Sequence, residues 1–289
     1  MKNFSAYGFA DIGSVRTVNE DHILLGRFIK NRGGMGLSFS EDDDFARGYG
    51  LIFAVADGIG GERAGEVASR IALEVMEQHY YGFTRDQNNP DAFTQAVLIS
   101  STKANERILE LSACRPEYRG MGCTLSGICL MPSGILTFNA GDSRVYRFRA
   151  GSMRQLTEDD SLVGLAVRMG HLTIEEAAVS PQRHTIINNL GSSGFRITIQ
   201  PLLEWQDNDH ILICSDGLHD MVSVDMIKKT LGVEGSPEQA VRSLVQQAKD
   251  NGGYDNISAI IVHCTEGNGN DFSGKGLRRE YLECGDDHE

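Results

Sequence analysis

The sequence has little cysteine and little positive charge, and each shortage excludes a class of protein. Its six cysteines include no C-x-x-C pair, so neither a zinc ribbon nor a disulfide scaffold is expected. Lysine and arginine total 27 against 40 aspartates and glutamates, which gives a formal net charge of -13. Such a chain repels nucleic acid and anionic membranes but favours cations. We therefore expect neither nucleic acid nor a membrane among its partners.

Long apolar runs and proline are also scarce. No stretch approaches the roughly 20 apolar residues that span a bilayer. The N-terminal segment 1–13 has no uninterrupted apolar core of the kind found in secretion signals, so the expected location is cytoplasmic. Only 6 prolines stand against 33 glycines, which indicates a folded chain with many tight turns.

Hydrophobic periodicity predicts a mixed fold. Apolar residues at three- and four-residue spacing predict helices over residues 62–80 and from residues 88–91 to Pro116, and Ser223 and Ser236 begin two more. Short apolar runs predict strands over 6–12, 23–28, 51–56, 123–131, 135–140, 145–148, 210–214 and 257–264. The strands come in runs joined by hairpins, which favours an α+β fold of stacked, mainly antiparallel sheets covered by helices.

Three segments fall outside this pattern. Residues 29–50 are rich in glycine and carry the acidic run 41–44, so we interpret them as an inserted surface loop. Residues 157–194 open with Thr157 and Asp160 and continue with Thr173 and Glu176, two pairs that resemble capping boxes, and we expect a flap of short helices. Residues 265–289 are polar and are expected to form a flexible tail. The catalytic or binding domain is therefore predicted to span residues 1–264.

The chemical signal is a set of aspartates at strand ends. Asp57, Asp142 and Asp216 follow apolar strands, and Asp21 and Asp255 precede them. Strand ends are rigid, so they can hold carboxylates at fixed positions. Several carboxylates in one place repel one another unless cations lie between them, and oxygen ligands favour Mg²⁺ or Mn²⁺. Each Asp-Gly pair alone is also common in turns, so a purely structural role stays open for any single member.

The glycine-rich stretch 58–61 is not a nucleotide-binding loop. It has neither the lysine of a P-loop nor the spacing of a dinucleotide-binding turn. We interpret Gly58 instead as a residue whose missing side chain lets a backbone carbonyl approach a metal.

Six short motifs occur in an order and at a spacing that resemble a known family. They are Val15-Arg16 with Asn19-Glu20-Asp21, Asp57-Gly58 with Gly60-Gly61, Gly122-Cys123-Thr124, Gly141-Asp142-Ser143-Arg144, Ser215-Asp216-Gly217 and Asp255-Asn256. Over residues 1–264 the chain resembles the metal-dependent PPM (PP2C-type) serine/threonine protein phosphatases, in particular their bacterial branch. The resemblance implies an α-β-β-α sandwich of two mainly antiparallel sheets flanked by helices.

The resemblance also implies a site for two or three Mn²⁺ or Mg²⁺ ions. Asp57 would bridge two of them, and the Gly58 carbonyl, Asp21, Asp216 and Asp255 would complete the binuclear centre. Asp142 would hold a third ion together with Asp216, with Glu20 and Asn256 in supporting positions. Arg16 would clamp the phosphate, because a planar guanidinium can contact two phosphate oxygens at once.

By this resemblance the chain is a hydrolase of phosphoserine and phosphothreonine in proteins. A water between two cations would attack phosphorus directly, without a phosphoenzyme. A monomer that opposes a bacterial serine/threonine kinase in signalling is expected. One departure concerns the proton donor: eukaryotic members carry histidine where this chain has Ile59, so the donor is unassigned. A metal-bound water is one candidate, and His171 and His184 of the flap are others, although a lone flap histidine is more often a surface residue.

Two alternatives remain. A catalytically inactive relative would bind phosphoproteins or a regulator, although such relatives usually lose a metal ligand or the phosphate clamp, and here both are present. A hydrolase of small phosphomonoesters would use the same chemistry, because Arg16 does not distinguish a phosphoprotein from a free phosphate ester.

Overall fold

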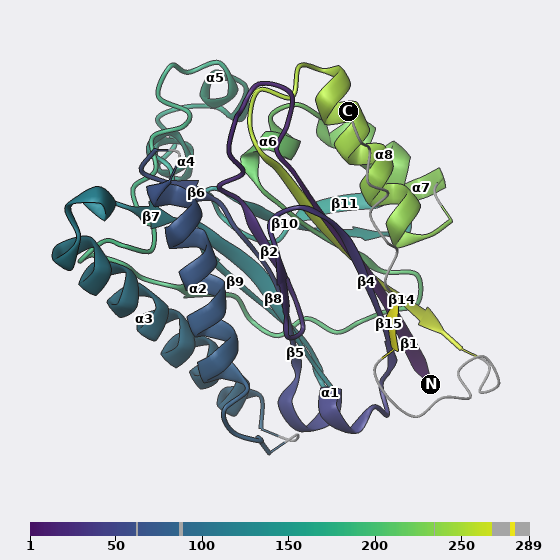
Figure 1. The fold of residues 1–289 in the computed structure, drawn as a ribbon. Helices are drawn as coiled ribbons and strands as arrows, with labels where there is room; N and C mark the ends of the chain where they lie inside the picture. The colour runs from purple at the N-terminus through teal and green to yellow at the C-terminus, as the bar shows by residue number, and fades with distance from the viewer. Residues whose placement is uncertain (62, 87–88, 234, 268–277, 281–289) are drawn as a thin grey trace, which may run out of the picture.

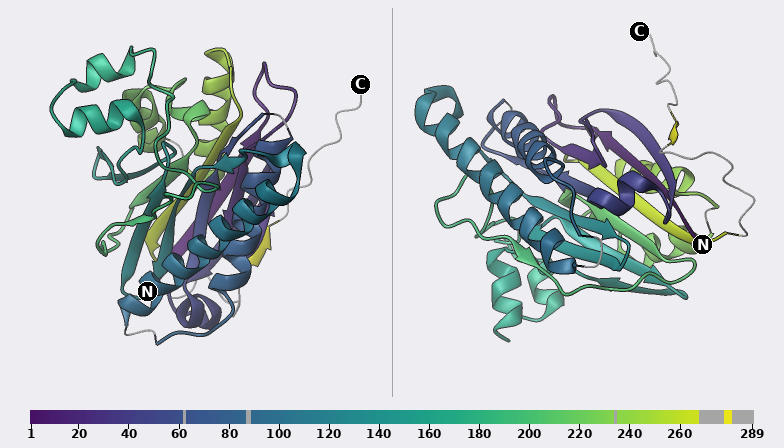
Figure 2. Two further views of the ribbon diagram at one scale, coloured as in Figure 1. Left: turned by 90° about the vertical axis from the view of Figure 1, so that its left-hand side faces the viewer. Right: turned by 90° about the horizontal axis from the view of Figure 1, so that it is seen from below.

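The computed structural model describes residues 1–61, 63–86, 89–233, 235–267 and 278–280. Two antiparallel sheets stack face to face, and helices cover the outer face of each (Figure 1). Figure 2 shows the same layers from the side and from below. The predicted α+β class and the α-β-β-α sandwich are therefore confirmed.

One sheet has seven strands. Its order is β11 (Ser152–Gln155), β10 (Arg144–Arg149), β13 (His210–Cys214), β14 (Ile257–Glu266), β1 (Lys2–Asp11), β4 (Gly33–Ser40) and β15 (Arg278–Glu280). The first and last long strands of the chain, β1 and β14, lie side by side at its centre, with Lys2 opposite Glu266 and Asp11 opposite Ile257. The sheet therefore joins the two ends of the described chain.

The second sheet has six strands. Its order is β12 (Thr198–Ile199), β9 (Gly134–Ala140), β8 (Leu125–Met131), β5 (Leu51–Ala56), β2 (His22–Leu25) and β3 (Phe28–Lys30). A small ribbon of β6 (Gly58–Ile59) and β7 (Gly122–Cys123) continues from its end. The strands β5, β8 and β9 are buried along their whole length, because one face meets the other sheet and the other face meets helices.

Helices cover both outer faces. On the six-stranded sheet lie α2 (Ala64–Tyr80) and α3 (Pro90–Cys114), and on the seven-stranded sheet lie α6 (Asp216–His219), α7 (Val224–Val233) and α8 (Pro237–Asp250). The remaining elements are α1 (Asp44–Tyr49), η1 (Pro116–Tyr118), α4 (Leu162–Arg168) and α5 (Ile174–Ala178). In the described part of the chain, no helix is both apolar enough and long enough to cross a bilayer.

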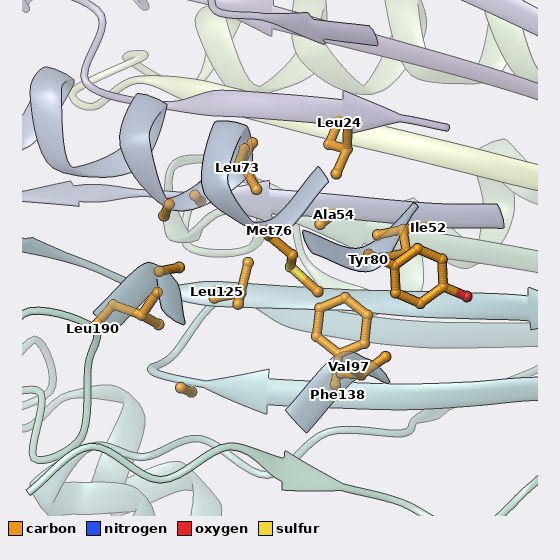
Figure 3. Packing of buried hydrophobic residues seen from close by; sticks show 14 of the residues in the cluster. Leu24, Ile52, Ala54, Leu73, Met76, Tyr80, Val97, Leu125, Phe138 and Leu190 are labelled. Atoms are coloured by element: carbon orange, nitrogen blue, oxygen red, sulfur yellow. The ribbon is translucent and has the colours of Figure 1, made fainter. Parts of the chain in front are cut away.

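The apolar core has three layers, one between the sheets and one beneath each helical cover. Figure 3 shows the layer under α2, where Leu73, Met76 and Tyr80 pack over β5 at Ile52 and Ala54. All five side chains are fully buried. Burying a side chain of this size contributes about 1.5–3 kcal/mol each, so this layer fixes α2 firmly on the sheet.

The predicted surface loop at residues 29–50 is wrong. The segment forms β3, β4 and α1, and β4 buries Met35, Leu37 and Phe39 while small residues alternate with them on the other face. The abundance of glycine concealed a strand period of two. Part of the acidic run is a helix cap, because the Asp43 side chain accepts a hydrogen bond of 2.9 Å from the Ala46 N–H.

The flap 157–194 holds two short helices, as predicted, but only one of the two capping boxes is real. Thr173 and Glu176 cap α5 reciprocally. Thr157 opens no helix, because its hydroxyl accepts a hydrogen bond from the Val145 N–H, and α4 starts instead after the N-cap Ser161.

Other boundaries shift by a few residues or cannot be compared. The helix predicted to begin within residues 88–91 begins at Pro90 as α3, and the helix predicted from Glu62 begins at Ala64 as α2. Glu62 and residues 87–88 lie outside the described residues. So do residues 268–277 and 281–289 of the predicted tail. Within that tail, residues 278–280 pair with β4, and the domain limit at residue 264 stays a prediction.

A stacked histidine pair predicts how stability depends on pH. His210 on β13 faces His263 on β14 with ring centroids 4.0 Å apart. Burial, together with the neighbouring His263, lowers the pKa of His210 to about 4, and burial also lowers the pKa of His263. An unfolded histidine titrates near 6.5, so the unfolded chain binds more protons between about pH 4 and 6.5. The folded state therefore loses stability as the pH falls through this window.

We expect His210→Gln to reduce that loss by on the order of 1 kcal/mol between pH 7.5 and 5. Urea unfolding of both proteins at the two pH values measures it. His171→Gln, which changes an exposed histidine, serves as the control. An equal pH dependence in wild type and His210→Gln would contradict the assignment.

Candidate metal centre

The five predicted acids come together at one end of the sandwich, the upper end in Figure 1 where β6 and α6 lie. In the six-stranded sheet His22 pairs with Ala56, so Asp21 and Asp57 are the next residues at the ends of adjacent strands. In the seven-stranded sheet Cys214 lies opposite Ala259 and Arg144, which brings the segments that carry Asp216, Asp255 and Asp142 to the same end.

The electrostatics of Asp57 show that the acids are close. Burial raises the pKa of Asp57 well above its ordinary value, and the charges of Asp21, Asp216, Asp142 and Asp255 raise it further, in that order. Every acid predicted from the sequence therefore acts on this one carboxyl group. The structure thus brings these carboxylates to one end of the sandwich, and their role as metal ligands stays a prediction.

The pKa values of two other buried acids, Asp21 and Asp142, are raised in the same way. Burial raises the pKa of Asp21 to about 7, against a hydrogen bond from Ser215 that lowers it, and the Asp216 charge adds to the rise. Burial and the Asp216 charge raise the pKa of Asp142 to about 7. These carboxylates are costly to ionise unless positive charge lies beside them.

Two buried carboxylate oxygens have no hydrogen-bond donor among the described residues. Asp21 Oδ1 and Asp216 Oδ1 are buried and accept no hydrogen bond from any residue that the structure describes. The other oxygen of Asp21 faces the fold, since Oδ2 accepts a hydrogen bond of 2.7 Å from the Ser215 hydroxyl. A buried acceptor without a donor suits a cation, and an all-oxygen donor set suits Mg²⁺ or Mn²⁺.

Within the described ranges, no three acidic, histidine or cysteine side chains already enclose a single cation position. This finding and the convergence of the acids are compatible. A hard cation such as Mg²⁺ keeps several waters and needs only one or two carboxylates, and a backbone carbonyl such as that of Gly58 can supply another oxygen. The raised pKa values and the unpaired oxygens therefore fit divalent cations at this end of the sandwich.

Asp57 is held by its backbone. Its N–H donates to the Thr124 hydroxyl at 3.1 Å, and its carbonyl accepts from the Thr124 N–H at 2.8 Å. The Thr124 hydroxyl also lies 2.8 Å from that of Ser143, beside Asp142. The motifs at residues 122–124 and 141–144 therefore act as supports that couple two of the acids.

Gly58 is required by packing as well as by any metal. A Cβ atom at this position would lie 2.4 Å from the backbone of Gly65 at the start of α2 and 2.8 Å from the Glu20 carbonyl oxygen. Three chain segments thus cross at van der Waals contact directly behind Asp57. A larger residue at position 58 would push α2 away from the acids.

Asn256 anchors the loop that carries Arg16. Its side-chain nitrogen donates to the carbonyls of Ile12 and Val18, and its side-chain oxygen accepts from the Glu20 N–H. Arg16 itself donates from Nη2 to Asp255 Oδ2 at 2.7 Å, and its side chain is 47% exposed. The predicted phosphate clamp therefore lies at the acids and remains accessible from outside.

Two histidines and one further aspartate lie beside the acids: His184, His219 and Asp220. Of these, the sequence predicted only His184. His184 of the flap lies with Nδ1 3.9 Å from Asp216 Oδ2 and 3.7 Å from Asp220 Oδ2. His219 is buried, with Nε2 3.1 Å from the Asp142 carbonyl oxygen and Nδ1 3.1 Å from Asp220 Oδ1. Of the two flap histidines predicted as proton donors, the structure brings His184 to the acids, whereas His171 is exposed on the flap.

The flap is tied to the Asp142 loop by ionic and backbone contacts. Arg144 binds Asp159 through two nitrogens, with Nε 3.0 Å from Oδ1 and Nη2 2.6 Å from Oδ2. The Asp160 N–H donates to the Gly141 carbonyl at 2.8 Å. The sequence assigned no role to Arg144 of the motif 141–144. The ion pair with Asp159 indicates one, because it holds the start of the flap beside the acids.

Comparisons with known proteins agree with this geometry. A sequence model described as protein phosphatase 2C matches residues 39–251. The serine/threonine protein phosphatase PstP of Mycobacterium tuberculosis is 33% identical over 232 residues, which cover 80% of this chain. The chain spans 44% of the length of that relative. Protein phosphatase PhpP of Streptococcus pneumoniae is 30% identical over 261 residues, which cover 89% of this chain and 96% of PhpP.

Solved structures show the same fold. The crystal structure of the catalytic domain of PstP in complex with two manganese ions superimposes with a TM-score of 0.71 at 26% identity, and the match covers 92% of this chain and all of that one. The two-sheet architecture and the length of the match both agree with the described fold.

The repulsion between the acids gives a prediction that needs no assay of activity. With divalent cations removed by a chelator, Asp57→Asn should raise the melting temperature by about 2 °C or more, because one negative charge leaves a crowded cluster. Excess Mn²⁺ should stabilise the wild type and stabilise Asp57→Asn much less. Thermal unfolding with chelator and with Mn²⁺ measures both effects.

Asp42→Asn, which removes an exposed acid far from this end of the sandwich, is the matched control and should behave as wild type in both conditions. If Mn²⁺ stabilises Asp57→Asn as much as the wild type, the assignment of Asp57 to the metal centre is wrong.

Proposed function

The chain belongs to the protein phosphatase 2C family, and from this we propose that it hydrolyses phosphoserine and phosphothreonine in proteins. The observation that carries the proposal is the convergence of Asp21, Asp57, Asp142, Asp216 and Asp255 beside the exposed guanidinium of Arg16. Manganese in the PstP catalytic domain and the phosphatase names of the relatives support it.

The acids would bind the cations, and Arg16 would bind the phosphate. Asp57, the Gly58 carbonyl, Asp216, Asp255 and Asp21 would hold two divalent cations, and Asp142 would hold a third with Asp216. When bound, such cations lower the pKa of water and supply a nucleophile for in-line attack on phosphorus.

Arg16 faces the phosphate from the open side of the site. Its fork of N–H groups can meet two phosphoryl oxygens, and it can stabilise the charge that gathers on them as the ester bond breaks. The ion pair with Asp255 holds this fork at the edge of the acidic centre. Asn256 keeps it there by fixing the loop on both sides of Arg16.

The location and partners follow as further parts of this proposal. We propose a cytoplasmic monomer that acts in signalling and removes phosphate placed by a serine/threonine kinase. The high negative charge of the chain supports the absence of nucleic acid among its partners.

An inactive phosphoprotein-binding relative is disfavoured. Such a protein has no use for buried carboxylates without donors, yet Asp21 Oδ1 and Asp216 Oδ1 lie in that state among the described residues. A hydrolase of small phosphomonoesters would use the same groups, and the choice of substrate is therefore the point that the assay must decide.

The first activity test compares substrates and metals. We expect wild type to release phosphate from a phosphothreonine peptide with Mn²⁺ and to lose this activity with a chelator. Asp57→Asn should lower kcat/KM by about 100-fold or more, because Asp57 would hold the cations that supply the nucleophile. Asp42→Asn should keep wild-type activity. Activity that survives the chelator would exclude the metal mechanism, and a preference for a small phosphomonoester over the peptide would favour the second hydrolase.

The role of Arg16 gives a graded prediction. Arg16→Ala should lower kcat/KM by about 100-fold, and Arg16→Lys by about tenfold, because lysine keeps the charge but loses the planar fork. Steady-state kinetics on the phosphothreonine peptide measure both, and the stabilisation by Mn²⁺ should remain in each variant. Equal activity of Arg16→Ala and wild type would contradict the proposed role of Arg16 in binding the phosphate.

A further inference from the structure

A hairpin at the edge of the seven-stranded sheet carries three arginines. It consists of β10 and β11, and β11 is the last strand on that side of the sheet (Figure 1). Ala150 and Gly151 join the two strands with positive φ angles of 47° and 72°, which is typical of a two-residue hairpin turn. The turn fixes the register, so Arg147 on β10 lies directly opposite Arg154 on β11. Arg149 follows two residues after Arg147 on β10.

The three arginines lie on the same face of this hairpin. Tyr146 and Phe148 of β10 are buried in the core layer under α7 and α8. Successive residues of a strand point to opposite faces, so Arg147 and Arg149 point away from that layer. Arg154 shares the face of Arg147, because residues directly opposite each other in a ladder point the same way. Arg154 is exposed and the other two arginines are half-buried, so solvent reaches this group of side chains.

Positive charge exceeds negative charge among these side chains. Arg149 is paired, with Nε 2.6 Å from Asp209 Oδ1 and Nη2 2.5 Å from Asp209 Oδ2. Neither Arg147 nor Arg154 forms a salt bridge with an acid in the described ranges. Burial lowers the pKa of Arg147, the charges of Arg149 and Arg154 lower it as well, and the charge of Asp209 opposes them. Three guanidinium groups thus face one carboxylate, in a chain whose formal net charge is -13.

This arrangement is unfavourable for the isolated chain and suits a phosphate group. Like charges directly opposite each other destabilise an antiparallel pair, and an anion between Arg147 and Arg154 would remove their repulsion. The planar fork of each guanidinium can meet two oxygens of one phosphate. A phosphorylated threonine brings a charge near -2 and three acceptor oxygens, so it matches the two uncompensated guanidinium groups better than one carboxylate does.

We propose that Arg147, Arg149 and Arg154 bind a second phosphorylated residue of the substrate while the first lies at the metal centre. This rests on the proposed function, because that function brings phosphorylated chains to the protein. β10 starts at Arg144, two residues after Asp142, and at about 3.3 Å per residue Arg147 lies roughly 10 Å farther along the strand. Five extended residues span up to about 17 Å, so one peptide can reach both places. The preferred substrates are then segments with two phosphates.

Binding is tested first without catalysis. A phosphothreonine peptide is titrated by NMR into the protein with a chelator present, so that the metal centre holds no cations. We expect saturable shifts of the amide signals of β10 and β11. A peptide with glutamate in place of phosphothreonine should bind about tenfold more weakly, and so should the phosphopeptide to the double variant Arg147→Gln with Arg154→Gln. Arg107→Gln, which changes an exposed arginine on α3, is the control and should bind as wild type.

The effect on substrate choice is tested with Mn²⁺. Two peptides carry phosphothreonine and, five residues before or after it, either a phosphonate that cannot be hydrolysed or glutamate. For wild type we expect the phosphonate peptide of at least one spacing direction to have a KM about tenfold lower than its glutamate partner, with equal kcat, because the second contact is the same in ground and transition states. The double variant should lose this difference and keep wild-type kinetics on a small phosphomonoester.

Site-specific shifts, together with a KM difference that the double variant loses, support the proposal. It is overturned by unchanged β10 and β11 signals at millimolar phosphopeptide, by equal binding of the glutamate peptide, by binding that the double variant retains, or by equal KM values for both peptides in both directions. If no peptide is hydrolysed with Mn²⁺, the proposed function fails, and the titration with chelator still decides whether the arginines bind phosphate. Thermal unfolding checks the fold of the double variant, which should be at least as stable as wild type because a repulsion is removed.

Discussion

Repulsion among buried carboxylates is the constraint on which this structure depends. Five aspartates share one end of the sandwich, and for Asp21, Asp57, Asp142 and Asp216 burial together with neighbouring negative charge raises the pKa of the carboxyl group. Such an arrangement is unfavourable for an isolated chain and becomes favourable once divalent cations lie between the acids. Much of the fold serves to hold these groups against their own repulsion, from the Thr124 clamp behind Asp57 to the Ser215 hydroxyl on Asp21.

Most of the fold and of the acidic centre could be predicted from the sequence. Strong apolar runs such as 51–56 and 210–214 match β5 and β13 residue for residue, since a strand buried on both faces has an unmistakable composition. The acids were found because each stands within two residues of the end of such a run. Convergence then follows from topology, since antiparallel strands place alternate chain directions at the same end of a sheet.

The features that could not be predicted from the sequence were missed for physical reasons. Residues 33–40 form a strand in which small residues fill every second position, so hydrophobicity alone did not distinguish it from a loop. The contacts of His184 and His219 depend on how the flap and α6 pack, and no local pattern encodes that. The supports at Thr124 and Asn256 bridge positions far apart in sequence; only the spacing of their motifs hinted at them.

The pairing of β1 with β14 bears on how the protein matures. The loop that carries Arg16 is held by Asn256, and Asp255 lies in the same late segment, close to the end of the described sandwich. A chain still emerging from the ribosome therefore lacks both the partner of β1 and one of its acids until Asp255 and β14 have been translated. Competence for chemistry would arise in a single late step, when β14 inserts between β13 and β1, and a product truncated before β14 would be left without an assembled centre.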